Sequence, residues 1–179
     1  MQPWPSFIAS ITIASSMMLT GSSYAQSTAK KGVVNPLLSS TGPKTCQNTS
    51  YPGFRGAKKS FNWTTSPDCH VFSKGKHLVC ENASGGVVYV ETSSWDAKSK
   101  SVTTRFYISE PYKDYDVTTY TWDRKDDTFH SRGSDGGLPT HATRKYYPNG
   151  ATIFRYASVE KGKEKLLLEI KCQPKGNRK

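Results

Sequence analysis

The chain has 179 residues, of which 35% are hydrophobic, 12% aromatic and 22% charged, and its formal net charge is +11. This length fits one domain, and the aromatic content excludes an intrinsically disordered chain. The excess of basic residues favours anionic partners over cationic ones.

The first 25 residues are predicted to be a signal peptide. No Asp, Glu, Lys or Arg occurs before residue 30, and Phe7–Leu19 is largely apolar. This run is too short to cross a bilayer, which needs about 20 residues. Ser23 and Ala25 supply small side chains at positions −3 and −1 of a cleavage site before Gln26. We therefore expect a soluble protein, secreted or periplasmic after cleavage near Ala25.

The remaining chain is predicted to be an arm followed by one β domain. Residues 26–60 are rich in Ser, Pro, Gly and Lys, which favours a basic arm with at most a short helix near residues 34–39. Residues 61–173 break into short Val-, Thr-, Tyr- and Phe-rich runs at a spacing of about 8–12 residues, with turn residues between them. Residues 174–179 form a basic tail.

This strand pattern predicts an all-β fold, an antiparallel up-and-down meander that closes into a lipocalin-like barrel. Tight turns between consecutive runs favour the meander, and closure removes exposed strand edges. A β-sandwich would give the same pattern of runs and stays open as the alternative.

The four cysteines predict two disulfides, because an even number in an exported chain is typical of disulfide pairing. Residues 69–72 and 77–80 flank the turn-like residues 73–76, and a four-residue hairpin loop there places Cys69 opposite Cys80. The second bridge is then Cys46–Cys172, which ties the entry segment to the last strand.

Zinc is the rival interpretation of the cysteines, but no CxxC spacing is present. His70 and His77 fall on different rungs of the predicted hairpin. We predict no metal site and no cofactor.

Five segments of the chain resemble a family of bacterial exported lipocalin-like small β-barrels of unknown function. They are Phe61–Trp63, Cys69–Cys80, Ser94–Lys98, Tyr120–Asp123 and Glu164–Cys172. The likeness covers residues 61–173. It implies a calycin-type barrel in an exported bacterial protein, and it implies no catalytic residues because the family has none agreed.

No catalytic motif is recognisable, and we predict that the protein is not an enzyme. The four histidines occupy separate runs, outside motifs such as GxSxG or HExxH. A secreted ribonuclease would need a Glu–His–Arg set, for which the chain offers Glu91, His130, Arg105 and Arg132, but nothing in the sequence fixes their spacing.

The basic residues concentrate at the two ends. Residues 26–67 carry six bases and no acid, and four bases with no acid follow Glu169. A Cys46–Cys172 bridge would gather this charge on one side, where it could hold the protein at an anionic polymer or lipid surface. No specific nucleic-acid partner is predicted.

The sequence also points to a ligand site inside the barrel. Asn149-Gly150 predicts a two-residue hairpin turn, which pairs Arg144 with Arg155. A second turn at Lys161-Gly162 assigns both arginines to the apolar, inward face. Directly opposed like charges destabilise a sheet, and a buried unpaired cation costs several kcal/mol.

Two explanations for this pair remain open. In the first, Arg144 and Arg155 bind the anionic group of a small amphipathic ligand, with Tyr146 and Trp122 as neighbours. The second is structural: a buried acid, Glu91 or Asp116, neutralises them, or a bulge turns one of the two arginines out to solvent.

Overall fold

A computed structural model describes residues 35–84, 87–109 and 114–176 of the chain. The predicted signal peptide, residues 1–25, lies outside the described residues, as does the first part of the predicted arm, residues 26–34.

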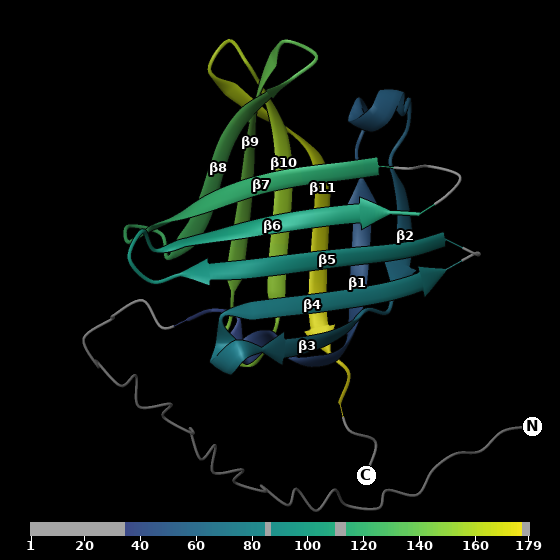
Figure 1. The fold of residues 1–179 in the computed structure, drawn as a ribbon. Helices are drawn as coiled ribbons and strands as arrows, with labels where there is room; N and C mark the ends of the chain where they lie inside the picture. The colour runs from purple at the N-terminus through teal and green to yellow at the C-terminus, as the bar shows by residue number, and fades with distance from the viewer. Residues whose placement is uncertain (1–34, 85–86, 110–113, 177–179) are drawn as a thin grey trace, which may run out of the picture. The chain divides into compact units, whose positions relative to one another are not determined.

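The described residues form eleven strands and three short 3-10 helices (Figure 1). The strands are β1 (Gly42–Ser50), β2 (Phe61–Thr65), β3 (Asp68–Phe72), β4 (His77–Ser84), β5 (Val87–Asp96), β6 (Ser101–Ile108), β7 (Asp114–Asp123), β8 (Thr128–Asp135), β9 (Leu138–Tyr146), β10 (Thr152–Glu160) and β11 (Lys163–Pro174). The helices are η1 (Leu38–Ser40), η2 (Phe54–Gly56) and η3 (Ser73–Gly75).

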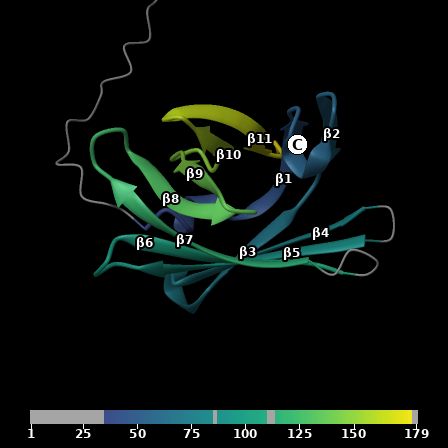
Figure 2. The ribbon, with the colours of Figure 1, turned by 90° about the horizontal axis from the view of Figure 1, so that it is seen from above.

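Ten of these strands close into an antiparallel barrel. From β3 to β11 each strand pairs with the next in the chain, and β1 joins β11 on one side and β3 on the other. β2 is an additional strand alongside β1. Seen from above, β3–β7 form one layer, while β8–β11 and β1 form the other (Figure 2). The predicted up-and-down barrel is confirmed, and the sandwich alternative is not.

The barrel begins earlier in the chain than the sequence predicted. β1 lies wholly within residues 26–60, which were expected to be an arm, yet it pairs with β11 from Lys44↔Pro174 to Ser50↔Leu168. Hydrophobic alternation could not reveal this strand, because three of its buried residues, Lys44, Asn48 and Ser50, are polar. Without β1 the sheet would have two open edges.

One end of the barrel is filled with side chains. Leu37, just before η1, is fully buried and packs with residues of several strands, namely Cys69, Leu78, Val102, Tyr120, Phe129 and Ala142. The side chain of Asn35 donates a hydrogen bond to the carbonyl of Gly75 in η3 (2.6 Å), which fixes the segment before η1 on this end. Among the described residues, every helix is far too short to span a bilayer.

Both predicted disulfides are present. Cys69 lies opposite Cys80 in the β3–β4 hairpin, and Cys46 lies opposite Cys172 in the β1–β11 pair that closes the barrel. Disulfides persist in oxidising compartments, so the two bridges indicate an extracellular or periplasmic environment.

The register of β9 and β10 differs by one residue from the prediction. Tyr146 pairs with Thr152, so Arg144 lies opposite Phe154 instead of Arg155. The connection is a three-residue loop: the amide of Gly150 donates to the carbonyl of Tyr147, and Gly150 has φ +83°. Pro148 favours the first central position of a type I turn, followed by a left-handed glycine, and this geometry replaces the expected two-residue turn.

A bulge between Tyr156 and Ala157 alters the pairing of β10 with β11. The predicted turn at residues 161–162 does form, and Ala157 pairs with Leu166 as expected. Beyond the bulge, however, Arg155 pairs with Glu169 rather than Leu168. A one-residue slip moves side chains to the other face of a sheet, so Arg155 points out of the barrel.

Candidate functional site: the barrel cavity

A cavity of about 590 Å³ occupies the barrel interior above the packed end. This volume lies within the range of about 300–1,000 Å³ that is typical of small-molecule sites. Strands β1–β6 and β9–β11 and helix η2 contribute its lining, which includes all four cysteines. Phe61 on its rim is 52% exposed, so the cavity reaches the surface beside β2.

Aromatic and aliphatic side chains make up most of the cavity wall. Phe61 stacks on Trp63 with ring centroids 5.0 Å apart, and Tyr89 stacks on Phe106 at 6.4 Å. The other apolar lining residues are Phe54, Leu78, Ile108, Phe154, Leu168 and Ile170. Alternation along each strand produces this wall, because every second residue of a barrel strand points inward.

An ion pair between Arg144 and Glu91 lies inside this apolar wall. The two guanidinium Nη atoms donate to the two carboxylate oxygens, the Nη2–Oε2 distance being 3.0 Å. The Arg144 Cζ atom also lies 5.4 Å from the ring centroids of both Tyr120 and Phe154. The acid that the sequence analysis considered as a neutralising partner for Arg144 is therefore present, and it is Glu91.

Both partners are charged. Burial by itself would raise the pKa of Glu91, but the charge of Arg144 and its hydrogen bonds hold that pKa below the ordinary value. Burial would likewise lower the pKa of Arg144, but the Glu91 carboxylate keeps it well above the ordinary value. A bidentate pair of this kind fixes the orientation of both side chains.

Lys44 of β1 adds a second buried cation. Its ammonium donates to the carbonyl of Gly150 at 2.6 Å, and its residue is only 3% exposed. Burial lowers the pKa of Lys44 to about 8; the Glu91 carboxylate opposes this shift and the Arg144 charge adds to it. At neutral pH the inner part of the cavity therefore holds two cations and one carboxylate.

Two polar atoms beside the ion pair have no hydrogen bond of good geometry among the described residues, although the Arg144 guanidinium lies close enough to the Tyr146 hydroxyl to oppose the rise of its pKa. The two atoms are Nε of Arg144 and the hydroxyl of Tyr146, both buried. Burial raises the pKa of Tyr146, so its hydroxyl keeps its hydrogen and can donate it. Buried donors without partners are costly, and an acceptor in the cavity would satisfy them.

The four predicted ligand residues separate into two groups. Arg144 and Tyr146 line the cavity. Arg155 is 54% exposed and forms an ion pair with Glu169 on the outside (Nε–Oε2 2.8 Å), so the predicted pair of opposed arginines is wrong. Trp122 is not among the described lining residues; its indole donates to Asp127 at 3.2 Å and its ring packs against the filled end.

Lys44 is the functional residue that the sequence analysis missed. Lys44, Cys46 and Asn48 alternate along β1 and all line the cavity. The predicted disulfide between Cys46 and the last strand was the available signal. Alternate residues of a strand point to the same face, so Lys44, two residues before Cys46, points to the same side as that cysteine.

The structure does not gather the residues considered for a ribonuclease site. Glu91 faces the cavity and pairs with Arg144, whereas His130 bonds to Asp126 and His141. Arg105 and Arg132 are exposed.

Comparisons with protein families and with curated proteins find no match for this chain.

Proposed function

We propose that this protein is an exported, non-enzymatic barrel that binds a small amphipathic anion in its cavity. The ligand class has a carboxylate or another singly charged anionic group attached to an apolar body. The observation that carries the proposal is the cationic surplus at the inner end of an otherwise apolar cavity.

The inner part of the cavity has a surplus of positive charge because it holds two cations, Lys44 and Arg144, and one carboxylate, Glu91. Glu91 is engaged by both Nη atoms of Arg144, and Lys44 contacts only a neutral carbonyl oxygen. A ligand anion near Lys44 would balance its charge and could accept hydrogen bonds from Tyr146 and from Nε of Arg144. Charge-assisted hydrogen bonds in a low-dielectric site are about twice as strong as neutral ones.

The apolar wall suits the remainder of such a ligand. Its stacked aromatic pairs and the aliphatic residues of β6 and β11 present a largely hydrophobic surface, interrupted by polar residues such as Asn48 and Thr65. Burial of apolar ligand surface gains roughly 25 cal/mol per Å². Export agrees with the two disulfides, which need an oxidising compartment.

A displacement titration tests the proposal. The fluorescent anion anilinonaphthalene sulfonate is bound to the full chain and displaced with dodecanoate or with dodecan-1-ol, which have the same number of carbon atoms but carry a carboxylate and a neutral hydroxyl head group, respectively. We expect dodecanoate to displace the probe at lower concentration, and Lys44→Met to remove that preference. Lys163→Met, which changes an exposed lysine at the start of β11, is the matched control.

Native mass spectrometry of protein purified from its own host gives an independent measurement. A co-purifying small anion supports the proposal. An empty barrel that does not bind the probe, and that elutes from heparin only at high salt, contradicts it and favours the basic ends as a module for an anionic polymer or membrane surface.

A further inference from the structure

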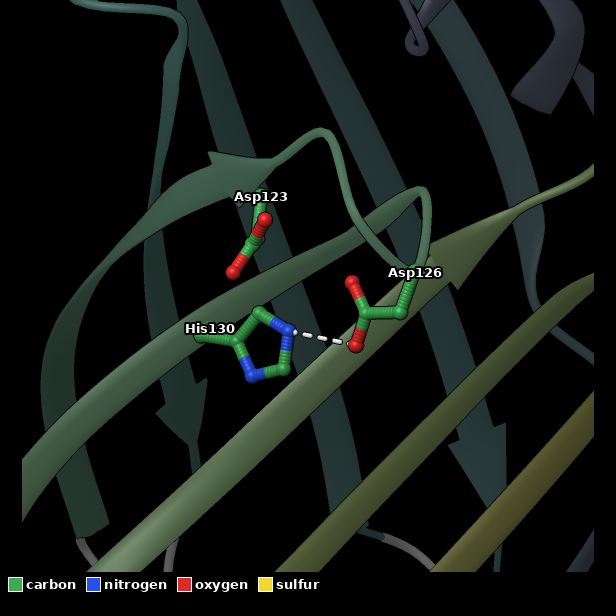
Figure 3. A group of neighbouring side chains, drawn as sticks. All are labelled: Asp123, Asp126 and His130. Atoms are coloured by element: carbon green, nitrogen blue, oxygen red, sulfur yellow. Dashed lines mark hydrogen bonds and ion pairs between the residues drawn. The ribbon is translucent and has the colours of Figure 1, made fainter.

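The β7–β8 turn brings three metal-ligating side chains together on the molecule, at a place separate from the cavity. Asp123 is the last residue of β7, Asp126 lies in the turn, and His130 lies in β8. One ligand atom from each lies within 4.8 Å of the others, and Figure 3 shows the three side chains facing the same space. Nε2 of His130 is 2.9 Å from a carboxylate oxygen of Asp126.

The local sequence fixes this arrangement. Asp123 pairs with Thr128 across a four-residue loop, and Asp127 has the positive φ of +55° that closes the loop. The amide of Lys125 donates to the Asp123 carboxylate at 2.8 Å, and the Thr128 hydroxyl donates to the carbonyl of Asp126 at 3.1 Å. The turn therefore holds both carboxylates above the imidazole of the following strand.

The other ring nitrogen of His130 is held by a second, more buried group. Nδ1 of His130 lies 2.9 Å from Nε2 of His141, and Nδ1 of His141 contacts the carboxylate of Glu164. The two rings are nearly parallel, with an interplanar angle of 12°, and His141 is only 7% exposed. This series of contacts, from Nδ1 of His130 through His141 to Glu164, does not involve either aspartate.

The contacts of the two histidine rings suit a cation bound at the turn. A histidine that donates one N–H to a carboxylate and coordinates a cation through its other nitrogen is a recurrent arrangement in metal sites. With a cation on Nε2 of His130, its Nδ1–H donates to His141, and the Nδ1–H of His141 donates to Glu164. Each of the four ring nitrogens then has one role, as a metal ligand, a hydrogen-bond donor or a hydrogen-bond acceptor.

With both rings neutral the same contacts conflict. Nε2 of His130 must carry a hydrogen for Asp126, and Nδ1 of His141 must carry one for Glu164. If both rings are neutral, the two facing nitrogens then both present lone pairs to each other. A cation in place of the hydrogen on Nε2 removes this conflict, as one further proton on the pair of rings also would.

We propose that Asp123, Asp126 and His130 bind a divalent transition-metal cation, preferentially Zn²⁺, with His141 and Glu164 as positioning residues. Two carboxylate oxygens and one imidazole nitrogen are ligands that Zn²⁺ accepts, and three protein ligands leave a fourth position for water. The two carboxylates balance the charge of the ion. Both aspartates are exposed, so their side chains can adjust to the metal–ligand distances. The ammonium of Lys145 donates to the backbone carbonyl of Asp126, not to its carboxylate, and Arg124 and Lys125 are exposed within the turn.

Competition with a chromogenic chelator tests the site directly. The full chain with intact disulfides is freed of metal and titrated with Zn²⁺, and we expect one high-affinity equivalent that is lost in Asp126→Asn and in His130→Gln. Glu164→Gln should weaken Zn²⁺ binding by less than the roughly 10–100-fold that follows removal of a ligating histidine's direct partner, because Glu164 acts on His130 through His141. Ca²⁺, which prefers all-oxygen sites, should bind far more weakly.

The chain provides a matched control. His70 and Asp68 form another exposed histidine–aspartate pair, at 3.5 Å, and they are not part of the three-ligand group that the described residues contain. His70→Gln should leave Zn²⁺ binding unchanged. Equal losses in His70→Gln and His130→Gln, absence of a tight equivalent in the unmodified chain, or equal affinity for Ca²⁺ would overturn the proposal.

Histidine ¹⁵N spectra of the unmodified chain give a measurement that needs no variant. Zn²⁺ should shift Nε2 of His130 to the position of a metal-bound nitrogen, while Nδ1 of His141 keeps its hydrogen. A shift at His70 or His77 in place of His130 would contradict the site.

Discussion

Arg144 of β9 and Glu91 of β5 are 53 residues apart in the chain and form a bidentate ion pair within the barrel. Neither strand is adjacent to the other in the sheet. The pair therefore spans the interior and links the two layers of the barrel.

Breaking this pair should strongly destabilise the fold. Arg144→Met leaves the Glu91 carboxylate buried without its partner, and removal of one member of a buried ion pair typically costs about 3–5 kcal/mol. We expect a corresponding fall in the free energy of unfolding measured with urea. The double variant Arg144→Met/Glu91→Leu should recover most of the loss, because it also removes the carboxylate that Arg144→Met alone leaves without its bidentate partner.

Arg105→Met is the control for this experiment, since Arg105 is exposed on β6. If Arg144→Met were no more harmful than Arg105→Met, the ion pair would not contribute to stability as the geometry indicates.

The two disulfides should contribute unequally to stability. Cys46–Cys172 closes a loop with a sequence separation of 126 residues, and Cys69–Cys80 one of 11. The chain-entropy relation gives about 5 kcal/mol for the long loop and about 3 kcal/mol for the short one. We expect the Cys46→Ser/Cys172→Ser variant to unfold at lower urea concentration than Cys69→Ser/Cys80→Ser; the reverse order would show that the loop-closure term does not dominate.

Lys44 should make stability and anion binding respond to pH in opposite directions. Its pKa falls from 10.5 to about 8 because burial disfavours the charged form. Between pH 8 and 10.5 the unfolded chain holds a proton on Lys44 that the folded chain has released, so the Lys44 contribution to the free energy of unfolding rises with pH. Over the same window the cavity loses a positive charge, and affinity for anilinonaphthalene sulfonate should fall.

Urea unfolding and probe titration from pH 7 to 10 measure the two effects. Lys44→Met should remove both, whereas Lys163→Met should retain them, since Lys163 is exposed. Identical pH profiles for the two variants would show that Lys44 is not the group responsible.

Substitution of Gly150 should lower the free energy of unfolding by more than its positive φ alone would cause. Gly150 and Gly162 have similar positive φ values, +83° and +75°. A Cβ at Gly150 would lie 2.6 Å from the carbonyl oxygen of Ser39, whereas one at Gly162 would meet no atom within 4 Å. Gly162→Ala should cost about 1–2 kcal/mol, the price of a left-handed alanine, and Gly150→Ala should cost more. Comparable melting temperatures for the two variants would contradict the close contact with Ser39.

Structural features that depend on residues close together in the sequence were predicted correctly. The Cys69–Cys80 pairing followed from a hairpin loop of four residues, and the Ala157–Leu166 pairing from a two-residue turn. Strand spacing predicted the meander, because consecutive antiparallel strands need only short local connections. These features depend on backbone geometry within about ten residues, which the sequence displays directly.

Strand pairings that change when a strand shifts by one residue were predicted incorrectly. Pro148 lengthened the β9–β10 loop by one residue, and a bulge after Tyr156 altered the next pairing, so that Arg155 came to face solvent. The alternation of side chains has a period of two, and a single slip therefore exchanges inside and outside for a whole strand. No local pattern in the sequence marks the bulge.

The sequence by itself determined the fold class, the two disulfides and an inward-facing Arg144, since each follows from local alternation or from a count of residues. Only the tertiary structure decided which groups meet inside the barrel and at the β7–β8 turn. Glu91 reaches Arg144 from the opposite layer, and Lys44 joins them from a strand whose composition resembles a loop. His130 similarly acquires His141 and Glu164 from two other strands. Barrel closure sets the contacts of Lys44 and Glu91, because it brings together strands that are distant in the chain and fixes their relative stagger.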